Sequence, residues 1–167
     1  STIDHSRYKK DYDIFLAKID NENKKIDDKV IWLKTFDNIL EGNNTYEYPT
    51  SIFIAQDGNI LLACFISSES AILVMNINKD GSEKWRKKIT YFSTTNIKIS
   101  YCPLKIIEDK FENIVVLAAQ NDGSIENVNE SSFRTFSIFQ LSKSNGTVNW
   151  RKDFNKDYDL DFVLGNL

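Results

Sequence analysis

Three tryptophans at corresponding points of three similar segments constrain this chain more than any other feature. Trp32, Trp85 and Trp150 close segments that read DIFLAKID…VIWLKTF, AILVMNINKDGSEKWRKKI and TFSIFQLSKSNGTVNWRKDF. In each segment an alternating strand leads into a polar turn, and a short strand follows with the Trp near its start. Lys or Arg comes just after the Trp each time. A supersecondary unit that recurs along a chain indicates a fold built by repetition.

The composition is that of an ordinary β-rich domain. The 167 residues are 41% hydrophobic and 13% aromatic, which suffices for a buried core and favours strands. A net charge of −3 excludes the basic surface that nucleic-acid-binding proteins use. The longest apolar run, ILLACFI at 60–66, is too short for a membrane helix. We therefore expect a single domain over 1–167 with no nucleic-acid partner and no membrane span.

Alternation and turn residues together predict ten strands. These are Asp13–Asp20, Val30–Asp37, Thr50–Gln56, Ile60–Ser67, Ala71–Asn78, Glu83–Thr90, Leu104–Glu108, Ile114–Gln120, Arg134–Leu141 and Thr147–Phe154. Gly58, Gly81 and Gly146 each follow Asp or Asn, a pair that tolerates the positive φ of tight turns. Pro49 and Pro103 are expected just before a strand, where a missing N–H costs little.

Four strands for each tryptophan correspond to one blade of a β-propeller. We expect an all-β fold with full blades at 48–90 and 101–154 and partial blades at 12–37 and 157–167; an unrelated meander or sandwich is the alternative. The repeat positions are Trp32, Trp85, Trp150, Gly58, Gly81 and Gly146.

Because a closed propeller needs at least four blades, this one is expected to be incomplete. It would be completed by a partner chain, by a second copy or by the rest of a longer protein. The candidates for pairing outside the chain are its end segments, DIFLAKID and DYDLDFVLGNL.

The segment AILVMNINKDGSEKWRKKI resembles the repeat of the quinoprotein-like (PQQ-like) bacterial propellers, whose units typically end in D-x-x-G-x-x-x-W. IFIAQDGNILLACFI and IIEDKFENIVVLAAQ are similar to the first hairpin of such a repeat. The resemblance implies a propeller outside the cytoplasm: in the periplasm, on the cell surface or secreted. The first residue is Ser1 and not Met, which is expected of a processed chain or of a fragment. Quinone-dependent members use an adjacent cysteine pair and a calcium site. Cys64 and Cys102 are far apart in the sequence, so we expect no cofactor and no metal.

The longest loops predict where a partner would bind. In a blade, the connections Asn38–Glu47, Tyr91–Ser100, Ser67–Ser70 and Asn121–Phe133 share one face, and long loops on a rigid scaffold often carry binding. The candidate partner-binding residues are Tyr46, Tyr48, Tyr91, Phe92, Tyr101, Asn121, Asp122, Glu126 and Asn129. The alternative is that the polar ones are solvated and the aromatic ones cap the blade core.

No catalytic arrangement is readable. His5 is the only histidine, and the loops carry Glu and Asp without a His- or Lys-centred set. We therefore expect a non-catalytic binding or scaffold module with a protein partner, in an extracytoplasmic or cell-surface complex. The alternatives are an enzyme domain of the quinoprotein type and a carbohydrate-binding module, since Trp can stack on a sugar, although Trp at repeat positions more often packs in the core.

Overall fold

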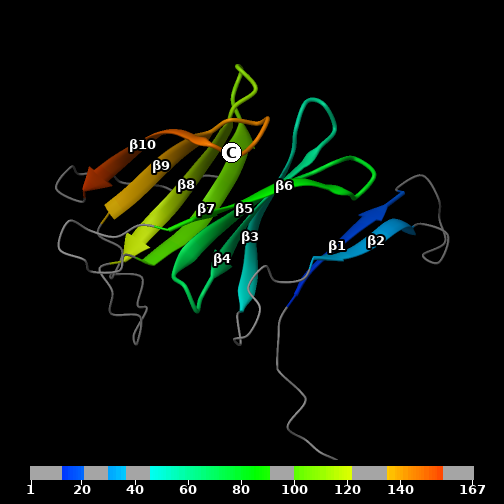
Figure 1. Cartoon of the computed structure of the whole chain (residues 1–167), viewed down its shortest axis with the longest axis horizontal. Coiled ribbons are helices and arrows are strands. Elements are labelled where there is room, and N and C mark those ends of the chain that lie inside the picture. The colour runs from blue at the N-terminus through cyan, green and yellow to red at the C-terminus, as the bar shows by residue number, and fades with distance from the viewer. Residues whose placement is uncertain (1–12, 21–29, 37–45, 91–99, 122–134, 156–167) are drawn as a thin grey trace, which may run out of the picture.

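Ten antiparallel strands make up the described part of the chain, which comprises residues 13–20, 30–36, 46–90, 100–121 and 135–155 of the computed structural model (Figure 1). They are β1 (Ile14–Ile19), β2 (Val30–Phe36), β3 (Glu47–Ile54), β4 (Ile60–Ile66), β5 (Ala71–Ile77), β6 (Glu83–Ile89), β7 (Ser100–Glu108), β8 (Ile114–Asn121), β9 (Thr135–Leu141) and β10 (Val148–Asn155). The prediction of an all-β fold is confirmed.

The strands form three sheets in chain order: β1–β2, then β3–β6, then β7–β10. Within each sheet every strand is hydrogen-bonded to its neighbour in sequence, and none of the described sheets closes on itself. The β3–β6 sheet lies between the other two (Figure 1). This stack of open sheets positions the surfaces described below.

The middle sheet is covered on both faces. On one face Leu61 and Val74 join a core cluster with Ile106 of β7. On the other face Leu73 joins a second cluster with Ile14 of β1. All seven residues of β5 are consequently buried. In the sequence, the two apolar faces of this strand predict that it is buried between two sheets. The structure places the strand there.

The three polar turns have the backbone that their glycines predict. Gly58, Gly81 and Gly146 have φ values of 82°, 84° and 72°, a left-handed region that side chains rarely adopt. In each turn the preceding Asp or Asn side chain accepts a hydrogen bond from the backbone N–H two residues further on, at 2.9–3.0 Å. These turns bring the strands back antiparallel within each sheet.

The prediction for the two prolines is wrong in detail. Pro49 and Pro103 lie inside β3 and β7 rather than before them, so both strands begin earlier than expected. Each proline lies at a shift in strand register. Both strands are also at the edge of their sheet. A bulge on an edge strand accommodates a residue that has no N–H to donate.

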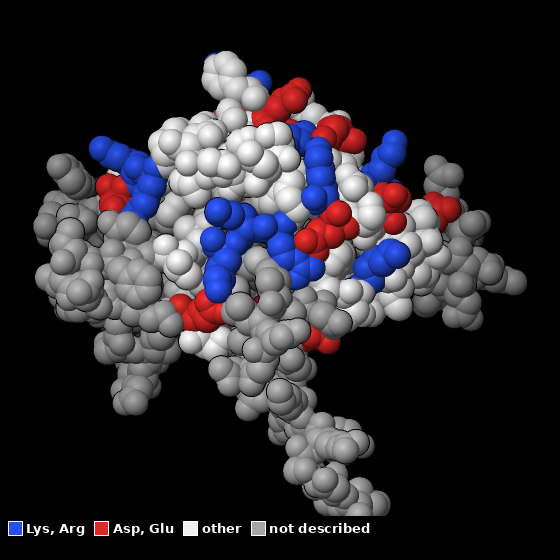
Figure 2. Space-filling view, viewed as in Figure 1, with Lys and Arg blue, Asp and Glu red and all other residues white. Residues whose placement is uncertain are grey.

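The surface carries charges of both signs. Figure 2 shows Lys and Arg side chains lying beside Asp and Glu across the visible face. The described residues contain no helix of sufficient length and apolarity to cross a membrane.

Candidate functional site

The tryptophan of the first sheet docks on a glycine turn of the second. A Cβ atom added to Gly81 would lie 2.9 Å from the Trp32 ring, closer than real Cβ contacts come. The Trp32 indole Nε1 donates a hydrogen bond to the carbonyl oxygen of Lys79, in the same turn, at 3.2 Å. Only a residue without a side chain leaves room for the ring at this approach.

The tryptophan of the second sheet docks on the third in the same way. A Cβ atom on Gly146 would lie 2.7 Å from the Trp85 ring, and the Trp85 Nε1 donates to the carbonyl oxygen of Lys143 at 2.8 Å. We name each of these turns a glycine seat: a turn whose glycine faces an indole and whose carbonyl accepts its N–H. Both seats join one sheet to the next in chain order.

Trp150 occupies the same position on the last strand of its sheet, but its side chain is 43% exposed. The expectation that this residue belongs to the core is therefore wrong for the described structure. None of the glycine turns among the described residues lies on its ring. The strand position is thus shared by all three tryptophans, whereas burial depends on a seat from a neighbouring sheet.

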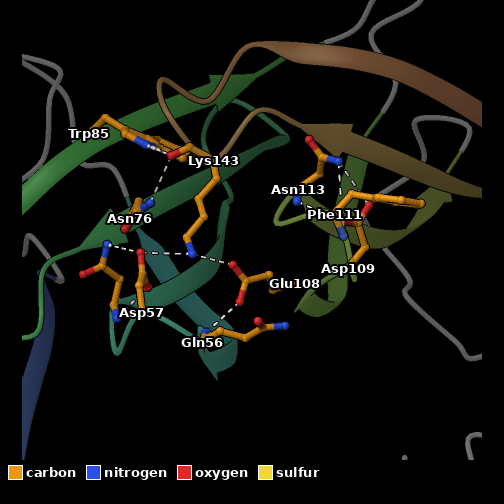
Figure 3. A network of polar contacts seen from close by, with 10 residues as sticks. Gln56, Asp57, Asn76, Trp85, Glu108, Asp109, Phe111, Asn113 and Lys143 are labelled. Atoms are coloured by element: carbon orange, nitrogen blue, oxygen red, sulfur yellow. Dashed lines mark hydrogen bonds and ion pairs between the residues drawn. The ribbon is translucent and has the colours of Figure 1, made fainter.

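The Gly146 turn also carries an ion-pair junction between the two four-stranded sheets (Figure 3). The Lys143 ammonium bonds to a carboxylate oxygen of Glu108 and lies 3.0 Å from Oδ2 of Asp57. The other oxygen of Glu108 accepts the backbone N–H of Gln56 at 2.7 Å. The side chains of Lys143 and Glu108 are 11% and 1% exposed. The junction is thus shielded from water on its Glu108 side.

The charges of this junction are fixed by their partners. Burial alone would lower the pKa of Lys143, but hydrogen bonds to Glu108 and Asp57 outweigh it and hold that pKa above its ordinary value of 10.5. Burial likewise opposes ionisation of Asp57, whereas the hydrogen bonds from Lys143 and from the Asn59 N–H bring its pKa below 3.8. A lysine that stays protonated is not a nucleophile, so the junction holds sheets together rather than supplying a reactive group.

A second polar cluster stabilises the turn after β7. The Asp109 carboxylate accepts hydrogen bonds from the backbone N–H groups of Phe111 and Asn113 at 2.8 and 2.9 Å (Figure 3). It also accepts one from the side-chain amide of Gln140 at 2.9 Å. Although burial opposes it, these hydrogen bonds lower the pKa of Asp109. All of these contacts lie within one sheet, so the cluster is a turn-stabilising element.

The structure describes only part of the predicted partner-binding set. Tyr48 lies on β3 and is exposed, and Tyr46 next to that strand is partly buried. Tyr101 is fully buried, with its ring edge-on to Phe139 at 5.5 Å between centroids and Arg151 at 5.5 Å over its face. Tyr101 is therefore a core residue and does not form part of an exposed binding surface in this structure.

The remaining members of that set are not placed. Asn121 is the last residue of β8, and its side chain is not among the described ones. Outside the described residues lie Tyr91, Phe92, Asp122, Glu126 and Asn129. The loop face as a whole stays a prediction.

An apolar groove, which the sequence alone did not reveal, runs between β1 and β3. It comprises hollows of about 230 and 330 Å³. Its principal apolar lining residues are Ile14, Leu16, Ile52, Ile54, Ile60 and Leu62. Ile52 and Ile54 are 52% and 61% exposed. The signal in the sequence was the run of three large apolar residues that ends β3. Consecutive residues of a strand point to opposite faces, so a run of this kind needs to be covered on both faces.

The corresponding place on the third sheet is covered. Ile106 of β7 pairs with Val116 as Ile52 of β3 pairs with Leu62, so the two isoleucines hold the same position. Ile106 is 0% exposed because it packs on the middle sheet, and its N–H donates to the Ser51 hydroxyl at 3.1 Å. The first sheet presents only two described strands to Ile52, and this leaves the groove open.

The cysteines form no pair. Cys64 is buried and Cys102 partly buried, and both are free thiols. Burial and then the charge of Glu47 raise the pKa of Cys64 to about 12, and burial raises that of Cys102. Among the described residues no three His, Cys, Asp or Glu side chains are grouped to hold a metal ion, and His5 lies outside those residues.

No family model matches the sequence, and no curated protein matches it significantly. The resemblance to quinoprotein-like propellers therefore stays a prediction from the residues that suggested it.

Proposed function

We propose that the chain is a non-catalytic protein-binding scaffold of the β-propeller type, similar to the quinoprotein-like repeats, that works in an extracytoplasmic or cell-surface complex. The single observation that supports binding is the open groove between β1 and β3. Ile52 there is half exposed, whereas Ile106 at the same position of the next sheet is fully buried. An apolar surface that is exposed on one sheet, although the equivalent surface of the next sheet is buried, indicates a binding partner.

The arrangement of the sheets supports the propeller part of the proposal. Two four-stranded sheets have the same sequential order, and the middle one packs against both of its neighbours. Trp32 and Trp85 dock on the following sheet through the same kind of glycine seat. Repetition of one sheet and one junction in the same direction is how radial β folds are built.

The proposal is tested by capture of partners from a native extract with the purified 167-residue chain. Replacing Ile52 and Ile54 by Lys places two charges in the groove, and we expect these changes to abolish capture. Phe111→Ser removes an exposed apolar side chain from the β7–β8 turn and should leave capture intact.

A second variant set tests the loop face, with Tyr46, Tyr91 and Asn129 replaced together by Ala. If this variant loses capture and the groove variant does not, the binding surface lies on the loops and not in the groove. Stoichiometric binding of a quinone or of calcium to the purified chain would replace the scaffold proposal with the enzyme alternative.

A further inference from the structure

Among the strands that the structure describes, β1 has an open edge beside the groove. Among the described strands it is hydrogen-bonded only to β2, whereas β5 and β9, which precede the Trp-bearing strands of the other sheets, are bonded on both sides. Half of the backbone N–H and C=O groups of an edge strand point away from its single neighbour. The edge Ile14–Ile19 therefore offers a six-residue template for one more strand.

The other sheets define what such a strand must look like. In the middle sheet the neighbour of β5 is β4, which runs antiparallel to it. Leu61 and Ala63 of β4 are fully buried in the cluster that also contains Ile106. A strand antiparallel to β1 with apolar residues at alternate positions would cover Ile52 in the same way.

The charges at one end of the groove indicate which residues the incoming strand needs there. Lys18 and Lys79 line the end of the groove next to Ile19. A strand antiparallel to β1 starts at that end, so acidic residues at its N-terminal end would face these lysines. The groove therefore fits an extended segment that begins with acidic residues and continues with alternating apolar ones.

One segment of this chain has that pattern. Residues 157–167, which lie outside the described residues, read DYDLDFVLGNL, with Asp at three of the first five positions. Tyr158, Leu160, Phe162 and Leu164 follow one another at every second position. Alternation of this kind places the four apolar side chains on one face of an extended strand.

We propose that residues 157–167 of a second copy of the chain add to β1 as its missing neighbour and fill the groove between β1 and β3. The second copy is the source because β10, which precedes this segment, lies at the opposite end of the sheet stack from β1 (Figure 1). The inference rests on the proposed function, because it assigns an occupant to the surface on which that function depends.

The association is heterologous, because the segment of one copy meets the groove of another. Each bound pair keeps one free groove and one free segment, so further copies add head to tail. Sedimentation velocity of the full chain should therefore show species that grow with protein concentration beyond the 19.3 kDa monomer. A chain that stays monomeric up to about 0.2 mM, where weak self-association with a Kd near 0.1 mM would still be visible, overturns the inference.

Two variants of the full chain separate the two sides of the contact. Ile52→Lys blocks the groove and leaves the segment intact, and the pair Leu160→Ser and Phe162→Ser disables the segment and leaves the groove intact. Each variant alone should sediment as a monomer. An equimolar mixture should form a one-to-one dimer, because each supplies the side that the other lacks. Continued self-association of either variant alone, or a mixture that stays monomeric, overturns the inference.

Phe111→Ser, on the far turn of β7–β8, is the matched control and should associate like the unaltered chain. Circular dichroism of every variant establishes that its strands are folded. The outcome also separates this inference from the proposed function. A monomeric chain whose groove variant loses capture of another protein contradicts the second-copy contact and leaves the scaffold proposal standing.

Discussion

Trp85 and Trp150 hold the same place in two neighbouring sheets and have different surroundings. Each lies on the last strand of its sheet, with Lys two positions later. Trp85 is wedged against Gly146 and donates its N–H to Lys143. Trp150 is 43% exposed. The comparison separates the place of a tryptophan on its strand, which the repeat determines, from the burial of its ring, which a neighbouring sheet determines.

The difference extends from the ring to the turn beneath it. The β9–β10 turn supplies Trp85 with a glycine that leaves space, a carbonyl that accepts the indole N–H and a lysine paired to Glu108. The following predictions remove the indole ring, remove the paired lysine and fill the space at the glycine, and compare each change with a site that lacks the same surroundings.

Removing the ring should have the largest effect. We expect Trp85→Ala to lower the free energy of unfolding by about 3–4 kcal/mol, because it empties the space on the Gly146 turn and deletes a hydrogen bond. Trp150→Ala should cost less than about 1 kcal/mol, since this side chain is already 43% exposed and none of the described glycine turns lies on its ring. Urea unfolding of both variants measures the difference. Equal losses would show that the seat adds nothing to strand position.

Removing the cation of the junction should have the next largest effect. We expect Lys143→Met to cost about 3 kcal/mol, because the Glu108 carboxylate is left buried without its positive partner. Lys88→Met breaks the more exposed pair with Glu69 and should cost less than about 1 kcal/mol.

The double variant Lys143→Met with Glu108→Leu sharpens this result. Well-packed apolar residues can replace a buried ion pair without loss, so the double variant should regain most of the stability that Lys143→Met loses. A double variant less stable than the single one would mean that the junction stabilises through contacts other than the charge pair. Urea unfolding of the three proteins gives the answer.

Adding a methyl group to the seat should have a smaller effect. Gly146→Ala places a Cβ 2.7 Å from the Trp85 ring at a φ of 72°, and we expect a cost of about 2–3 kcal/mol from crowding and backbone strain. Gly58→Ala meets the same backbone strain, but the nearest atom to its Cβ is 3.9 Å away. It should cost about 1 kcal/mol. Similar values for the two variants would refute the role of crowding by the indole.

Acid should produce the smallest effect. Because the pKa of folded Asp57 lies below 3.8, the stability that its charge contributes is present above that pH and is lost as the pH falls through the folded pKa. Asp57 is 43% exposed on its side chain, so we expect less than about 1 kcal/mol. The stability difference between the unaltered chain and Asp57→Asn, measured by urea unfolding from pH 6 to pH 2.5, should shrink across the acid end. A constant difference would contradict this.

Local patterns in the sequence predicted the local structure well. All ten strands form, and the three glycine turns have the positive φ that their Asp-Gly and Asn-Gly pairs favour. These features depend on residues within a few positions of one another. Pro49 and Pro103 were misplaced because a bulge admits proline inside an edge strand, and a bulge leaves no mark in alternation.

Contacts between residues far apart in the sequence could not be predicted from it. Glu108 and Lys143 are 35 residues apart, and nothing near either one indicates that two turns meet. The exposure of Ile52 and of Trp150 depends on which strands lie beside them, and the burial of Tyr101 depends on the packing of Phe139 and Arg151. Alternation tells which face of a strand is apolar, but not whether another sheet covers that face.

Because the pKa of Cys64 is raised, the reactivity of this thiol reports when the middle sheet separates from its neighbours. Because burial raises this pKa to about 12, very little of the folded protein carries Cys64 as the reactive thiolate at pH 8, whereas an ordinary cysteine is partly ionised there. In a chain whose other cysteine is changed by Cys102→Ser, a thiol reagent would modify Cys64 only when the middle sheet separates from its neighbours. The rate of that reaction therefore measures how often the interior of the stack becomes accessible to solvent.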